Sequence, residues 1–126
     1  MRNLVISFII FFILIITIVF SINFLDNKAN FYSEQANQLE TLVVKDSWDE
    51  AYETSTNFLD AWKEDSKKIS MFINHFQVDS ISNQILKLTQ YTKYHDKTEA
   101  LALIHDIKFM LKELLEIEKV TISNIF

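Results

Sequence analysis

Three histidines and several acids are the side chains of this sequence that could perform acid-base chemistry or bind a metal. Only His75 has an acid four residues later, Asp79, which would place an imidazole and a carboxylate on one helical face. One such pair supplies too few ligands for a metal site, and a histidine near a helix end commonly meets the helix dipole or a free carbonyl. His95 falls in an expected connection, and His105 lies beside Asp106 on a helix flank. We therefore predict no catalytic and no metal-binding residue, and keep His75 as a candidate interaction residue.

Acidic side chains also cluster at Asp49–Glu53 and at Glu64 and Asp65. Such clusters could in principle form an acid-base pair or a calcium site. Lys67 and Lys68 follow Glu64 by three and four residues, which is typical of ion pairs along an exposed helix. We interpret these acids as a solvated face.

Trp48 and Trp62 are fourteen residues apart and fall on one helical stripe. Two aromatic rings so placed could form a cage for a cationic ligand. Core packing is the favoured interpretation, with each indole N–H at the edge of the core beside a hydrogen-bond acceptor.

The 126 residues include no glycine, no proline and no cysteine. Without glycine, the usual phosphate-binding loops, dinucleotide fingerprints and nucleophile elbows cannot form, and tight hairpins are disfavoured. Without cysteine, disulfide frameworks and thiolate metal sites are excluded. The length allows one domain beside a membrane segment. We expect an all-α protein that binds no cofactor.

Residues 1–22 predict a single-pass transmembrane anchor. The stretch Leu4–Ile22 has 19 residues and no charge, and about 20 apolar residues span a bilayer core. Arg2 precedes it, whereas Asp26 and Lys28 nearly cancel after it, so the positive-inside rule places the N-terminus in the cytoplasm. Residues 23–126 would then form a domain outside the cell membrane.

Two alternatives to an anchor fit the same stretch less well. A cleaved signal peptide would have a shorter apolar region and a better cleavage site than Val19-Phe20-Ser21. A buried helix of a soluble protein would be apolar along one stripe, whereas Phe8–Ile16 is apolar on every face.

Beyond the anchor, apolar residues recur every three or four positions, which predicts an antiparallel four-helix bundle. The first helix continues from the membrane to about Val44, with a seam at Leu25, Ala29, Tyr32, Ala36, Leu39 and Val43. Asp46 or Ser47 would cap a second helix. Its expected seam is Trp48, Tyr52, Ser55, Leu59, Trp62, Ser66, Ile69, Ile73 and Phe76. Ala51, Phe58 and Phe72 would widen this seam into a face that packs against more than one neighbour.

The third helix is expected to begin at a cap on Asp79 and to bury Ile81, Ile85 and Leu88. Asp96 and Glu99 have the spacing of a capping box and predict the start of the fourth helix. Its expected seam is Ala100, Leu103, Ile107, Met110, Leu114 and Ile117. The tail, Val120–Phe126, receives no assignment.

Several short stretches together resemble a known family. They are the N-terminal anchor, Asp46-Ser47-Trp48-Asp49-Glu50-Ala51, Trp62, Phe72-Ile73-Asn74-His75, Glu99-Ala100 and Ser123-Asn124-Ile125-Phe126. The chain thus resembles an uncharacterised bacterial, clostridial-type family of membrane-anchored helical proteins, domain of unknown function 4363. This resemblance covers nearly the whole chain and implies work beside another membrane protein, with no established catalytic residue. Relatives often have Asp where this chain has Asn74, which weakens an acid-base or metal role for His75.

The net charge of the outer domain limits the classes of partner that it can bind. After Arg2, 11 lysines face 17 acidic residues, a net charge of −6 on the outer domain. Nucleic acid is therefore a poor partner. Peripheral binding to anionic lipid is also disfavoured, because it would need a run of Lys or Arg on one face.

The leading functional hypothesis is a non-enzymatic interaction module, an accessory subunit of a membrane or cell-envelope assembly. Its partner would be another membrane protein, which would pack near Phe31, an aromatic residue that the core seam does not explain. The alternative is a bundle that senses a small solute and signals through a partner protein. An enzyme built around His75 is a distant third. The sequence does not identify the ligand, the partner or the oligomeric state.

Overall fold

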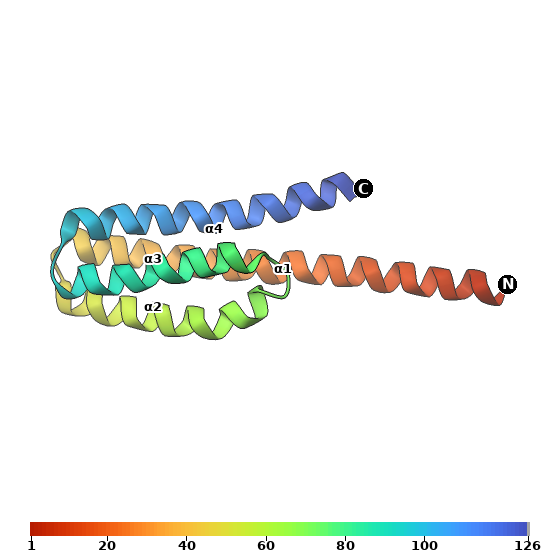
Figure 1. The fold of residues 1–126 in the computed structure, drawn as a ribbon, viewed down its shortest axis with the longest axis horizontal. Helices are drawn as coiled ribbons and strands as arrows, with labels where there is room; N and C mark the ends of the chain where they lie inside the picture. Colours follow the sequence, from red (N-terminus) through yellow and green to blue (C-terminus); the bar gives the residue numbers. More distant parts are fainter. Residues whose placement is uncertain (126) are drawn as a thin grey trace.

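The computed structural model describes the backbone of residues 1–125 and the side chains of residues 1–116. The described residues form four α-helices and no strand. The helices are α1 (Arg2–Val44), α2 (Trp48–Ile69), α3 (His75–Lys93) and α4 (Lys97–Ile125). They run alternately in opposite directions, and each packs on two neighbours (Figure 1). The predicted all-α four-helix bundle is confirmed.

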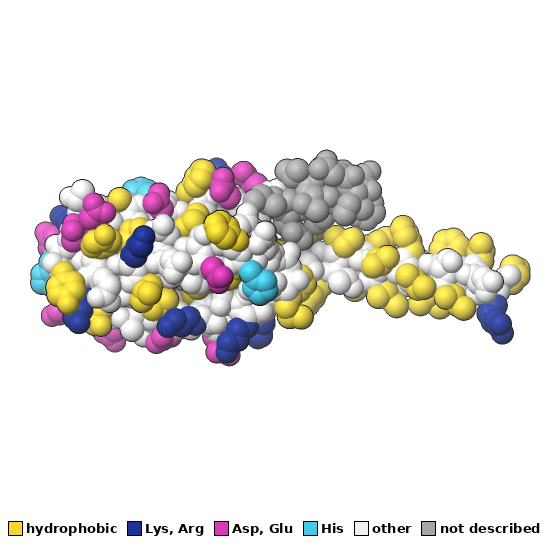
Figure 2. All heavy atoms as spheres, viewed as in Figure 1, with side chains coloured by type: hydrophobic (Ala, Val, Ile, Leu, Met, Phe, Trp, Pro, Cys, Tyr) yellow, Lys and Arg dark blue, Asp and Glu magenta, His cyan; other side chains and the backbone are white. Residues whose placement is uncertain are grey.

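The first helix is continuous from Arg2 to Val44, as predicted, and its two parts have different surroundings. Large apolar side chains between Leu4 and Phe20 are mostly exposed, on a part of α1 that projects beyond the bundle (Figure 2). From Ser21 onward, one side chain in every three or four is buried. The six seam residues predicted for this helix are all among them: Leu25, Ala29, Tyr32, Ala36, Leu39 and Val43.

The projecting part of α1 is long and apolar enough to cross a membrane. A signal sequence at an N-terminus would share this length and composition. Burial changes at Ser21, close to the end of the predicted anchor at Ile22. The end of the bundle therefore coincides with the end of the apolar segment.

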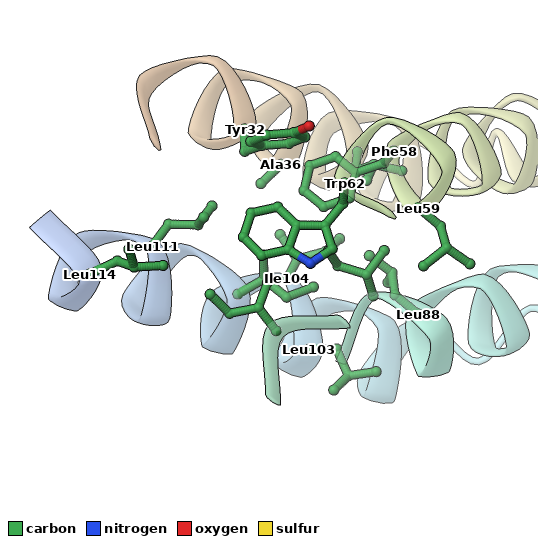
Figure 3. Close-up of a cluster of buried hydrophobic side chains, with 14 of the residues drawn as sticks. Tyr32, Ala36, Phe58, Leu59, Trp62, Leu88, Leu103, Ile104, Leu111 and Leu114 are labelled. Atoms are coloured by element: carbon green, nitrogen blue, oxygen red, sulfur yellow. The ribbon is translucent and has the colours of Figure 1, made fainter. Parts of the chain in front are cut away.

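An aromatic cluster lies at the centre of the bundle (Figure 3). Trp62 is 1% exposed, and its ring centroid lies 5.1 Å from that of Tyr32. Tyr32 in turn lies 5.3 Å from Phe58, and both contacts are edge-to-face, the favoured aromatic geometry. The Trp62 indole N–H donates to Ser82 Oγ at 2.9 Å. The prediction that Trp62 is a core residue with a satisfied N–H is confirmed.

The expected boundary between the second and third helices is wrong. Helix α2 ends at Ile69, so its seam does not reach Ile73 and Phe76. Asn74 caps α3, because its side chain accepts a hydrogen bond from the backbone N–H of Phe76 at 2.9 Å. Asp79, the expected cap, is an interior residue of α3. The three-four spacing continues across the break by coincidence.

The buried face of α2 is wider than its seam, as predicted, because it includes Ala51 and Phe58. Tyr52 is exposed, whereas its neighbour Ala51 is buried. The helix packs on both α1 and α3, so the centre of its buried face lies between those two contacts. The buried residues are Ala51, Ser55, Phe58, Leu59, Trp62 and Ile69.

The two connections at the far end of the bundle share one geometry. Asp46 and His95 have φ of 58° and 60°, the left-handed region in which non-glycine residues are uncommon. The next residue donates back to the helix in each case, from Ser47 N to Leu42 O and from Asp96 N to Tyr91 O, both at 2.9 Å. Left-handed residues thus end both helices without glycine.

The capping predictions at these connections had different outcomes. Ser47 occupies the cap position of α2, but its side chain makes no capping hydrogen bond. Asp96 caps α4 as predicted, because its Oδ1 accepts from Glu99 N at 3.2 Å. The side chain of Ile117 and the tail Val120–Phe126 lie outside the described side chains.

Candidate functional site

A shallow groove between α1 and α2 contains the predicted interaction residue Phe31. Its lining consists of Phe31, Tyr32 and Gln35 from α1 and Asn57, Phe58 and Ala61 from α2. Phe31 is 48% exposed, and its ring stands edge-on to Tyr32 at 5.1 Å. Aromatic rings beside two side-chain amides resemble the composition of protein interfaces, where buried apolar contacts lie within a polar rim.

A polar cluster lies beside this groove. The Tyr32 hydroxyl donates to Asp65 Oδ2, and Lys28 Nζ contacts the same oxygen at 3.0 Å. The cluster joins α1 to α2 next to the aromatic core. Its three side chains therefore connect the two helices that form the walls of the groove.

The ionisation of these groups follows from their surroundings. Burial and then the hydrogen bond to Asp65 raise the pKa of Tyr32 far above its usual value. Burial acts to raise the pKa of Asp65, but the hydrogen bonds from Tyr32 and Lys28 outweigh it and lower that pKa. Tyr32 thus remains a neutral donor and Asp65 an ionised acceptor, which makes Asp65 a weaker base than an ordinary aspartate.

Ion pairs in the described part of the chain join segments that are far apart in the sequence. Lys28 pairs with Asp65, Lys97 with Asp46 at 3.3 Å, and Lys108 with Glu40. The expected pairs of Glu64 with Lys67 and Lys68 are not among the ion pairs of the described side chains, which corrects that prediction. Glu64, Lys67 and Lys68 are all exposed, so each charge is solvated without a partner on the same helix.

A second, smaller pattern of charges surrounds Glu40. The hydrogen bond from Lys108 lowers the pKa of Glu40, burial opposes it, and the charges of Lys108 and His105 add to the lowering. His105 Nε2 lies 3.6 Å from Glu40 Oε1. His105 therefore faces α1 rather than standing alone on the flank of α4.

His75 is the first residue of α3, and its side chain is exposed. It stands next to, but does not line, a groove formed by Phe76, Gln77, Ser80, Ile81, Met110, Glu113 and Leu114. No group of three His, Asp or Glu side chains that could hold a metal occurs among the described residues. Phe31 lies in a groove between α1 and α2, whereas His75 begins α3, so the two candidates do not form one site.

The third histidine, His95, takes part in a contact that the sequence did not suggest. Its ring stacks on Trp48 with centroids 5.1 Å apart and an interplanar angle of 8°. Trp48 is half-buried, so it covers the far end of the bundle rather than filling the core.

The role of Asp65 was missed in the sequence, where it was assigned to a solvated face. A signal for it was present. Tyr32 falls on the core seam, and a buried tyrosine hydroxyl needs a polar partner. Lys28 lies one turn before Tyr32, and Asp65 lies three residues after the core residue Trp62. The sequence did not show that Lys28 and Tyr32 of α1 lie opposite Asp65 of α2.

One family matches the chain: Domain of unknown function (DUF4363), over residues 19–125. The chain belongs to this family. The DUF4363 match spans the bundle, including Phe31, Asp65 and His75, and only the last four residues of Leu4–Ile22. No curated protein and no solved structure matches the chain. The predicted resemblance to domain of unknown function 4363 is confirmed. The bacterial source and the membrane anchoring that the resemblance implied stay predictions, and the roles of the groove and of the apolar segment rest on physical argument.

Proposed function

We propose that this DUF4363 chain is a membrane-anchored helical subunit that binds another membrane protein outside the cytoplasm of a bacterial cell. One observation carries the proposal. Helix α1 passes without a break from a segment with mostly exposed apolar side chains to a segment that forms one wall of the bundle. Exposed isoleucine, leucine and phenylalanine over 17 residues are unfavourable in water and favourable in lipid.

The orientation rests on the charges that flank the segment. Arg2 lies before it, and Asp26 and Lys28 nearly cancel after it. In intact cells, added protease should remove a tag at the C-terminus and leave a tag at the N-terminus. The reverse pattern would contradict the orientation, and recovery of a chain that begins near Ile22 would show a cleaved signal rather than an anchor.

The groove around Phe31 is the proposed contact with the partner. Its α1 residues, Phe31 to Gln35, lie about 14 to 20 Å beyond Ile22 along the helix, at 1.5 Å per residue, so a membrane protein can reach it from the bilayer. Its aromatic floor and amide rim suit a protein surface. A glutamate in place of Phe31 would place an unpaired charge in this contact, and the partner should then be released.

Crosslinking in cells followed by affinity purification tests this contact. Phe31→Glu should recover less partner than the unchanged protein, whereas Phe109→Glu, at an exposed phenylalanine of α4, should recover the same amount. Equal recovery with both variants would rule out the Phe31 groove as the contact. Recovery of no partner by the unchanged protein would rule out the proposed subunit role.

The proposal includes no reaction. A non-enzymatic role is supported by Asp65 and Tyr32, whose side chains bind each other in the ion-pair cluster. The pKa of Asp65 is lowered there and that of Tyr32 is raised. Both shifts move the groups away from neutral pH, whereas a general base or acid works best with a pKa near the operating pH. Solute sensing is less well supported, because the grooves beside Phe31 and Phe76 measure about 180 and 130 Å³, below the roughly 300 Å³ at which ligand pockets begin.

A further inference from the structure

Two exposed hydrophobic side chains lie at the end of the bundle nearest the apolar segment. Met71 is 79% exposed and Phe76 is 77% exposed, more than any other large hydrophobic residue described after the end of α1. Met71 belongs to the connection between α2 and α3, and Phe76 to the first turn of α3. The fold buries neither side chain.

The position of this connection relative to the apolar segment follows from one contact. The ring of Phe72 lies 5.8 Å from that of Phe24 on α1. Phe24 is two residues beyond Ile22, or about 3 Å along the helix axis. The polar interface of a bilayer is about 5 to 8 Å thick on each side of its hydrocarbon core. With Leu4–Ile22 in the hydrocarbon core, the connection is therefore at the depth of the interface.

The view of the whole chain agrees with this placement. The connection between α2 and α3 lies beside α1 where the projecting part of α1 begins (Figure 1). The other two connections lie at the opposite end of the bundle. Of the three connections, the α2–α3 connection is thus the one beside the lipid surface from which α1 emerges.

Charged side chains of both signs lie near this end of the bundle. Lys67 and Lys68 are exposed in the last turn of α2, and Asp79 is exposed on α3. Glu113 lines the groove beside Phe76. Attraction to anionic headgroups is therefore not the driving force, and burial of apolar side chains in the interface is.

We infer that the α2–α3 connection is a second membrane contact, in which Met71 and Phe76 insert into the lipid interface beside the anchor. This inference rests on the proposed anchoring of α1. Its ligand is the lipid bilayer itself. Large apolar side chains such as phenylalanine bury favourably at the boundary between the headgroups and the acyl chains.

Fluorescent labelling of single cysteines tests the inference, because the chain has no cysteine of its own. The full-length protein is labelled with an environment-sensitive fluorophore at Met71→Cys and reconstituted into phosphatidylcholine vesicles. Two matched positions serve as controls. One is Tyr94→Cys, because Tyr94 is 72% exposed at the opposite end of the bundle. The other is Phe12→Cys, which places the label in the apolar segment.

The label at position 71 should emit at a shorter wavelength than the label at 94, and nitroxide on the lipid headgroups should quench it. Nitroxide on the acyl chains should quench the label at 12. Phe76→Ser should weaken the quenching at 71, because it removes the other side chain that inserts into the interface. Added phosphatidylglycerol or salt should change the quenching less than twofold.

The outcomes separate this inference from the proposal on which it rests. If the label at 71 behaves like that at 94 while the label at 12 is quenched, the second contact is wrong and the anchor stands. If the label at 12 is not quenched, the anchor is wrong as well. Shielding of position 71 in native membranes but not in pure lipid would show that a protein covers this connection, and would overturn the assignment to lipid.

Discussion

The two parts of α1 bury their side chains in opposite ways. Between Leu4 and Phe20, apolar side chains occupy every face of the helix and are mostly exposed. Between Ser21 and Val43, the buried residues follow one stripe. The difference shows that periodicity, rather than hydrophobicity alone, distinguishes a helix surface that meets a protein from one suited to lipid. Five predictions test this contrast, from the largest expected effect to the smallest.

The largest effect is expected in the bundle, at Trp62. Trp62→Ala removes a ring packed against Tyr32 and leaves a cavity, which should lower the free energy of unfolding by about 3 to 5 kcal/mol. Denaturant unfolding of the full-length protein in detergent, followed by helical circular dichroism, measures this loss. Phe31→Ala, on the exposed side of Tyr32, should cost less than about 1 kcal/mol. Equal losses would show that Trp62 is not the centre of the core.

A charge in the projecting part of α1 should act on membrane insertion instead. Leu14→Lys places an ammonium group near the middle of Leu4–Ile22, at a cost of about 2.5 to 3.5 kcal/mol. The fraction of the protein that resists alkaline extraction from membranes should fall. Leu86→Lys, at an exposed site on α3, should leave that fraction unchanged. Unchanged extraction of Leu14→Lys would contradict the assignment of this part to lipid.

The ion-pair cluster should contribute less than the aromatic core. Asp65→Ala leaves the Tyr32 hydroxyl and Lys28 without their acceptor, which should cost about 1.5 to 3 kcal/mol in the same unfolding experiment. Glu40→Ala breaks the more exposed pair with Lys108 and should cost less than about 1 kcal/mol. A reversed order would mean that the surface pair stabilises the bundle more than the cluster.

Acid should remove the contribution of Asp65. The pKa of Asp65 is lower in the folded protein than in the unfolded chain, where it is about 3.9. Its stabilising effect is therefore present above about pH 4 and is lost as the pH falls through the folded value. Unfolding measured across this range should show a smaller acid loss for Asp65→Ala than for the unchanged protein. Parallel pH profiles would exclude Asp65 as a source of the acid sensitivity.

The smallest effect is expected at His75. This exposed side chain begins α3 without a contact to the core, so His75→Ala should change the free energy of unfolding by no more than about 0.5 kcal/mol. A metal chelator should leave the unfolding curve unchanged. Destabilisation by either treatment would reveal a structural role that the position of His75 does not suggest.

The interior of α1 could be predicted from the sequence, because one uninterrupted helix keeps its periodicity over many turns. The boundary near Ile69 could not. Ile73 and Phe76 continue the spacing of α2 by chance, while the signal that ends the pattern is a single cap at Asn74. A capping side chain stabilises a helix by only about 1 kcal/mol, and it does not change the spacing of the apolar residues.

The contacts of the candidate site were less predictable than its residues. Phe31 was identified as an aromatic residue that the seam does not explain, and it is exposed beside a groove. Asp65 was assigned to solvent, because its partner Lys28 is 37 residues away in the sequence. Spacing within a helix is visible in a sequence, whereas the level at which two helices face each other depends on the connection between them.

The continuity of α1 has a mechanical consequence. The part of α1 from Ile22 to Val44 spans 22 helical rises and forms a lever about 33 Å long. With the projecting part in a bilayer, a tilt of about 20°, the average for transmembrane helices, displaces the far end of the bundle sideways by about 11 Å. Tilt responds to bilayer thickness. The connections at Asp46 and His95 would therefore change their lateral position as the thickness of the surrounding membrane changes, even though no atom within the bundle moves relative to another.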